Sequence, residues 1–180
     1  DELEGSVTGT YGNYDQMGVS GTVNVPVTDD FGMRLSALIK KRDGYVDNLD
    51  ERGHSDYNDE DSQNYRAKLR WDMTDAVTAR LSMGYNHVDD YNGLAVTNLS
   101  PPGLNVGEAL GGFSGTDSDN MASAINNGTD TDEYSGQLRF DVELENLDFV
   151  SVTTYWDYDS DSSVDSDGTS LIGQDVIHTY

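Results

Sequence analysis

The chain has 180 residues, a formal net charge of −24 and no cysteine, and its mean hydropathy is −0.63. The lack of cysteine excludes disulfides and thiolate metal sites, and the scarcity of Lys and Arg argues against nucleic-acid binding. Its 11 Tyr, 2 Trp and 4 Phe are too many for a disordered acidic chain. No run of about 18 apolar residues occurs, so a β-barrel is the only membrane-spanning fold that the sequence permits.

The first part of the chain contains three expected strands, at residues 4–11, 17–26 and 32–42. Apolar and polar residues alternate in the second and third of these, which is typical of a half-buried strand. Pro26 ends the second strand because proline has no amide hydrogen to donate to a sheet. Residues 43–62 are polar and are expected to form a long loop.

The strongest pattern in the chain is a predicted hairpin with strands at residues 63–72 and 76–88. Its apolar positions are Tyr65, Ala67, Leu69, Trp71, Val77, Ala79, Leu81, Met83 and Tyr85, each followed by a polar, charged or glycine residue. A period of two places the apolar side chains on one face of a sheet. Each arm is close to the roughly 9 to 11 residues that a tilted strand needs to cross a bilayer. We interpret the hairpin as part of a barrel wall, with its apolar side toward lipid and its polar side toward the lumen.

The second half of the chain combines long acidic loops with further strands. Loops are expected at residues 89–132 and 159–171, and strands at 133–144, 147–158 and 172–180. The strand at 147–158 has apolar residues at both odd and even positions, which indicates a bulge or a strand packed on both sides. The whole pattern predicts an all-β fold, an antiparallel up-and-down meander of about eight strands that forms part of an outer-membrane transporter barrel.

The lengths of the links between strands add a second signal. Every second link is tight, as at Val27–Asp30, Asp72–Asp75 and Glu145–Asn146, and the others are longer. Outer-membrane barrels have brief periplasmic turns and extended extracellular loops, so this pattern places the amino end on the periplasmic side. A soluble β-sandwich is the alternative, but it has no physical reason to segregate its loops in this way.

Five short segments, in this order and with these gaps, resemble the first barrel strands of TonB-dependent receptors, the outer-membrane transporters for iron chelates, vitamin B12 and some sugars. They are Tyr11–Asp15, Val23–Thr28, Lys41–Asn48, Tyr65–Trp71 and Asp165–Thr169. The resemblance covers nearly the whole chain.

The resemblance implies a location in the outer membrane of a Gram-negative bacterium, in contact with lipid and lipopolysaccharide. It also implies a barrel of about 22 strands closed by a plug domain, through which a TonB-type protein supplies energy. The chain contains neither a plug nor a partner-binding box, so it corresponds to the slice after the plug. Its long loops would form the extracellular vestibule for a ferric chelate or another scarce small molecule.

Four basic residues are candidates for lining the lumen: Arg66, Lys68, Arg70 and Arg80. Such a cluster would favour anionic ferric chelates, although charges in a lumen also pair with a plug. Five acidic residues are candidates for a calcium site, because calcium prefers hard oxygen ligands: Asp157, Asp159, Asp161, Asp165 and Asp167. Their spacing does not follow the EF-hand rule, and a solvated acidic loop or cations that bridge to lipopolysaccharide are the alternatives.

No catalytic motif is present in the sequence, and we expect no enzymatic activity. His54, His87 and His178 lie in separate segments without paired spacing, so each is expected to be an ordinary surface or lumen histidine. Two other readings of the strands stay open. One is a self-assembling β-rich structural or fibre-forming protein, held by strand-edge pairing and divalent cations. The other is a closed eight-stranded barrel.

Overall fold

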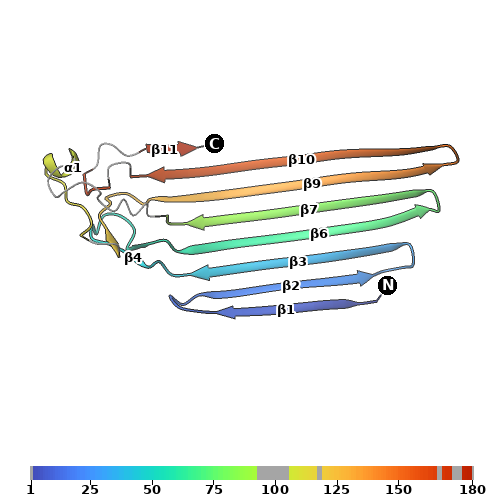
Figure 1. Ribbon diagram of the computed structural model, residues 1–180, viewed down its shortest axis with the longest axis horizontal. Coiled ribbons are helices and arrows are strands. Elements are labelled where there is room, and N and C mark those ends of the chain that lie inside the picture. Colours follow the sequence, from blue (N-terminus) through green and yellow to red (C-terminus); the bar gives the residue numbers. More distant parts are fainter. Residues whose placement is uncertain (1, 93–105, 117–118, 166–167, 172–175, 180) are drawn as a thin grey trace.

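The computed structural model describes residues 2–92, 106–116, 119–165, 168–171 and 176–179. It contains one long antiparallel sheet whose neighbours follow the chain in order (Figure 1). The strands of this sheet are β1 (Glu4–Tyr11), β2 (Met17–Pro26), β3 (Phe31–Arg42), β6 (Glu60–Thr74), β7 (Val77–Asp90), β9 (Gly128–Leu144), β10 (Leu147–Val164) and β11 (Val176–Thr179). The predicted all-β antiparallel meander of about eight strands is therefore confirmed.

The sheet is open, because β1 and β11 form its two edges and do not pair with each other in the described residues. Among the described residues, the closed eight-stranded barrel considered from the sequence is not formed. The described part of the chain contains one helix, α1 (Val106–Ala109), and no helix there has the length and apolar character needed to cross a membrane.

The tight links and the long links lie at opposite ends of the sheet (Figure 1). At the turn end, the amides of Val27 and Thr28 donate to the carbonyl of Phe31 at 2.9 and 3.0 Å. The β6–β7 and β9–β10 hairpins close at the same end. At the loop end a second, small sheet forms from β4 (Val46–Asn48), β5 (Asp56–Tyr57) and β8 (Asn120–Met121).

Several strands are longer than the sequence pattern indicates. β6 begins at Glu60 rather than 63, β9 at Gly128 rather than 133, and β10 ends at Val164 rather than 158. The expected loops at 43–62, 89–132 and 159–171 are shorter for the same reason, and they contain β4, β5, α1 and β8. Beyond the apolar part of each strand both faces are polar, so the period-two signal disappears although the hydrogen-bond ladder continues.

The register aligns the apolar residues of successive strands. Val25 on β2 lies opposite Met33 on β3, and Met33 lies opposite Leu69 on β6. The same row continues from Leu69 to Leu81 on β7 and to Leu138 on β9. Since side chains alternate between faces along each strand, these rows build one apolar face and one polar face.

Of the two alternatives for the strand at 147–158, a bulge or packing on both sides, the bulge is not formed. β10 pairs with β9 without a register shift from Leu147 to Ser163. Its apolar residues at odd and at even positions therefore lie on opposite faces of the sheet. Val152 lies opposite Arg139 and therefore on the polar face, whereas Phe149 lies opposite Val142 on the apolar face. The register shift of the long sheet occurs instead in β6, between Asp72 and Thr74.

As far as the chain is described, the long sheet is a single layer that carries no hydrophobic core of its own. The buried hydrophobic residues of the described chain are Val46, Tyr57, Met121 and Ala122, all at the loop end. On the apolar face, Trp71 is 49% exposed and Met83 is 45% exposed. A globular domain buries such a face against a second layer of structure, and the described residues supply none.

Candidate functional site

The polar face carries a row of three arginines. Arg70 on β6, Arg80 on β7 and Arg139 on β9 lie directly opposite one another. Like charges at such positions repel, and two carboxylates in the next row offset this repulsion. Arg70 Nε donates to Asp72 at 3.1 Å, and Arg139 Nε donates to Asp141 at 2.9 Å. Arg80 also forms an ion pair with Asp141, so the row is largely neutralised within the sheet.

Arg66 and Lys68, the other two predicted basic residues, lie on the same face and are exposed. Lys68 lies directly opposite Arg34 on β3, whose side chain is also exposed. Arg34, Arg66 and Lys68 form no ion pair within the described residues, and we call these three residues the open basic patch. The strand pairing thus brings all four predicted residues to one face and adds Arg34 and Arg139.

The four described residues of the predicted calcium set do not come together as one site. Asp157, Asp159 and Asp161 lie on one face of β10 at alternate positions, spread over roughly 13 Å along the strand. Asp165 lies beyond the strand and is buried, and its Oδ1 accepts a hydrogen bond from the amide of Gly168 at 2.8 Å. Asp167 is outside the described residues.

The long links fold into one packed unit at the loop end, which we call the loop cap: residues 43–59, 106–116, 119–127 and 165–171 where described. Its centre is formed by Val46, Tyr57 and Met121. The Tyr57 side chain is fully buried, and its hydroxyl donates to the carbonyl of Ile125 at 2.6 Å. Burial raises the pKa of Tyr57, so the hydroxyl remains a donor at neutral pH.

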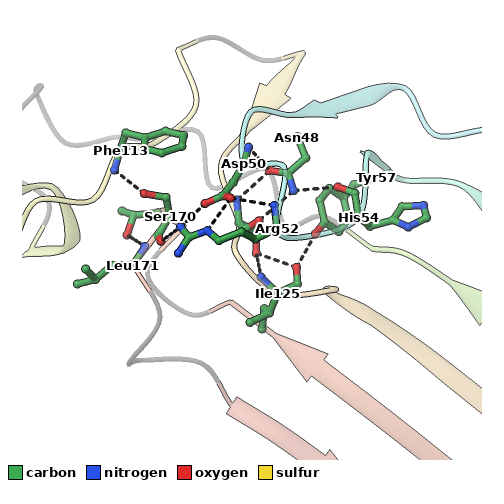
Figure 2. Close-up of polar contacts among 11 residues, drawn as sticks. Asn48, Asp50, Arg52, His54, Tyr57, Phe113, Ile125, Ser170 and Leu171 are labelled. Carbon is green, nitrogen blue, oxygen red and sulfur yellow. Dashed lines mark hydrogen bonds and ion pairs between the residues drawn. The ribbon is translucent and has the colours of Figure 1, made fainter.

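Two polar side chains connect distant parts of the loop cap (Figure 2). Asn48 Nδ2 donates to the carbonyls of His54 at 2.8 Å and Ser123 at 2.9 Å, and Asn48 Oδ1 accepts from the Ser123 amide at 2.9 Å. Arg52 pairs with the buried Asp50 and also donates to the carbonyl of Ser170 at 2.6 Å. Hydrogen bonds therefore join the first long link both to the second, through Asn48, and to the third, through Arg52.

Two carboxylates of the loop cap have opposite electrostatic surroundings. Hydrogen bonds from Arg52 lower the pKa of Asp50. Burial raises the pKa of Asp59, even though the carboxylate accepts a hydrogen bond from the amide of Tyr91 at 2.5 Å. Within the cap, the charged form of Asp50 is thus stabilised and the charged form of Asp59 is destabilised.

The sequence pattern did not indicate the loop cap, Arg34 or Arg139. Strand pairing from the hairpin outward would have found Arg139, because it lies opposite Arg80. The network of Asn48 and Arg52 leaves no such signal, since their partners Ser123 and Ser170 lie 75 and 118 residues away in sequence. Comparisons with known protein families, curated proteins and solved structures found no match to this chain.

Proposed function

We propose that the chain is a section of the wall of an outer-membrane transporter of the TonB-dependent type, with its apolar face against lipid. The observation that supports this most directly is the continuous apolar face of a single-layer sheet. Contiguous exposed apolar surfaces of this extent mark contact with a membrane or another protein. Lipid would cover the face without any second layer of protein.

The height of the apolar face agrees with the proposal. On β9 the apolar positions run from Tyr134 to Leu144, ten residue steps or about 33 Å along the strand. At a tilt of roughly 40° this corresponds to about 25 Å along the membrane normal, the usual height of the apolar band of such barrels. Tyr65, Tyr85 and Tyr134 lie in one row at its loop-end boundary, where an aromatic girdle would be expected.

The proposal assigns the loop cap to the extracellular side and the polar face to the lumen. The open basic patch supplies three unpaired cations there, which suits an anionic ferric chelate as substrate. The neutralised arginine row supplies none. A packed cap gives the vestibule a fixed shape, because its three links are held by mutual hydrogen bonds rather than moving independently.

Cysteine labelling tests the membrane assignment, since the chain has no cysteine of its own. Leu81 and Ser82 are neighbours on β7 with side chains on opposite faces. In the native polypeptide in membranes, a fluorophore on Leu81→Cys should be quenched by lipid-attached nitroxides. Ser82→Cys should instead react with a small water-soluble maleimide. Equal behaviour of the two variants in both assays would contradict the proposal.

A second candidate function is self-assembly through the sheet edges. β1 is an edge strand of eight residues, and every one of them is exposed. An edge of this length presents unpaired backbone groups that recruit further strands. Filaments in detergent-free buffer under negative stain would favour this function, whereas heat-modifiable gel mobility together with a requirement for detergent would favour the transporter wall.

A further inference from the structure

His87 and two aspartates form a compact group on the apolar side of the sheet, beyond the tyrosine row and toward the loop end. The Nδ1 atom of His87 lies 3.1 Å from Asp132 Oδ1 and 3.8 Å from Asp130 Oδ1. One donor atom from each of the three residues lies within 4.8 Å of the other two. The histidine is 25% exposed, so the group is accessible from solvent.

The register of β7 and β9 creates this group. His87 lies directly opposite Asp132, and Asp130 is two positions away on the same face of β9. The hydroxyl of Tyr85 donates to Asp132 Oδ1 at 2.6 Å and so fixes the orientation of the carboxylate. Outer partners of this kind are what orient the ligands of protein metal sites.

β10 adds further carboxylates to the same place. Asp159 lies directly opposite Asp132, and Asp161 lies directly opposite Asp130. Asp89 on β7 faces Asp130 from the other side. Like charges directly opposite one another destabilise a sheet. Within the described residues, His87 is the only ion-pair partner of Asp130 and Asp132, and the other three acids have none.

The charge balance of this group differs from that of the arginine row on the polar face. There, the row of three arginines is offset by Asp72 and Asp141. Here, five carboxylates lie around one imidazole, and no Lys or Arg of the described residues pairs with them, so the sheet itself supplies little positive charge. A bound cation would supply it, and an imidazole nitrogen among the ligands favours a transition metal over calcium.

We infer that His87, Asp130 and Asp132 bind a divalent transition metal ion such as Zn²⁺. Tetrahedral bonds of about 2.0 Å place donor atoms roughly 3.3 Å apart. The His87–Asp132 distance of 3.1 Å is close to this value, the His87–Asp130 distance is 3.8 Å, and all three donor atoms lie within 4.8 Å of one another. The site depends on the paired strands β7 and β9 alone, so it stands independently of the membrane proposal.

Calorimetric titration of the metal-free full chain with Zn²⁺ in detergent tests the inference. We expect one site per chain and a loss of at least about tenfold in affinity for His87→Ala and for Asp132→Asn. Two control variants should bind like the parent. His54→Ala removes a histidine of the loop cap, and Asp148→Asn removes one negative charge near the turn end of β10.

Diffuse attraction to a chain of charge −24 is the competing explanation. It predicts several weak sites, unchanged binding by His87→Ala, and equal weakening by Asp148→Asn and Asp132→Asn. Any of these results would overturn the inference.

Electron paramagnetic resonance of bound Cu²⁺ gives an independent readout, because a nitrogen hyperfine pattern should be present in the parent and absent in His87→Ala. Circular dichroism of each variant verifies that the sheet is intact.

Discussion

At the scale of single residues, the loop cap depends on close backbone approaches that only small side chains permit. A Cβ atom on Gly53 would lie 2.4 Å from the carbonyl oxygen of Ser123 and 2.8 Å from that of Ile125. Both obstacles are backbone atoms in the centre of the cap and cannot rotate away. By contrast, a Cβ atom on Gly9 in β1 would meet nothing within 4 Å.

Gly53→Ala should therefore destabilise the loop cap by about 1–3 kcal/mol, the usual cost of overpacking. Limited proteolysis between residues 43 and 59 measures the effect, since an opened cap exposes this link. Gly9→Ala is the matched control and should leave the cleavage rate unchanged. Equal cleavage of the Gly53 variant and the parent would mean that the close packing of Gly53 against Ser123 and Ile125 does not hold in solution.

Acid should loosen the cap at the Asp50–Arg52 pair. The pKa of Asp50 is lower in the folded cap than its unfolded value of about 3.9. The stability that the charged form contributes is thus fully present above that value and is lost as the pH falls through the lowered pKa. Once Asp50 is protonated, Arg52 is no longer held in position to donate to the carbonyl of Ser170.

Hydrogen exchange of the Ser170 amide, which donates to the carbonyl of Phe113 at 2.8 Å, measures this loosening. After correction for the intrinsic exchange rate, its protection should fall below about pH 4. Asp50→Asn should show the loosened state already at pH 7, with little further change on acidification. A parent protein with constant protection over this range would contradict the role assigned to Asp50.

At the scale of elements, the sequence pattern succeeds where one face is apolar and fails where both are polar. The 65–88 hairpin could be predicted because alternation and register specify the same face for Leu69 and Leu81. The ends of β9 and β10 could not, since acidic and hydroxyl residues occupy both faces from Asp157 to Ser163. The loop cap was equally unpredictable, because its order comes from hydrogen bonds between links far apart in sequence.

The arginine row gives a prediction for the β7–β9 pair. Asp141→Asn removes the carboxylate that pairs with both Arg80 and Arg139, and it leaves these two guanidinium groups directly opposite each other. We expect a lower midpoint of denaturation that is partly restored by added salt, which screens the repulsion. Glu143→Gln, on the same strand and face, removes the same charge without breaking an ion pair of the described residues. An equal shift for both variants would assign the effect to net charge.

At the scale of the whole molecule, the apolar face controls whether the sheet can exist by itself. Its rows of aligned aliphatic and aromatic side chains are only partly covered, and the four buried hydrophobic residues of the described chain lie at the loop end. If the chain is a section of a transporter wall, contact between this face and lipid is what stabilises the long sheet. A charge placed on it should then cost far more than the same charge on the opposite face.

Leu81→Lys and Gln137→Lys test this difference with the same introduced side chain. Leu81 lies between Leu69 and Leu138 in the middle of the apolar face, whereas Gln137 lies between Ser82 and Thr154 on the polar face. In lipid vesicles, Leu81→Lys should lower the free energy of unfolding by about 2–4 kcal/mol, the cost of a lysine near the bilayer midplane. Gln137→Lys should stay close to the parent, because its side chain remains in water. The fluorescence of Trp71 and Trp156 during guanidinium titration measures both values. Similar losses for the two variants would mean that water reaches both faces, and this would exclude lipid as the cover of the apolar face.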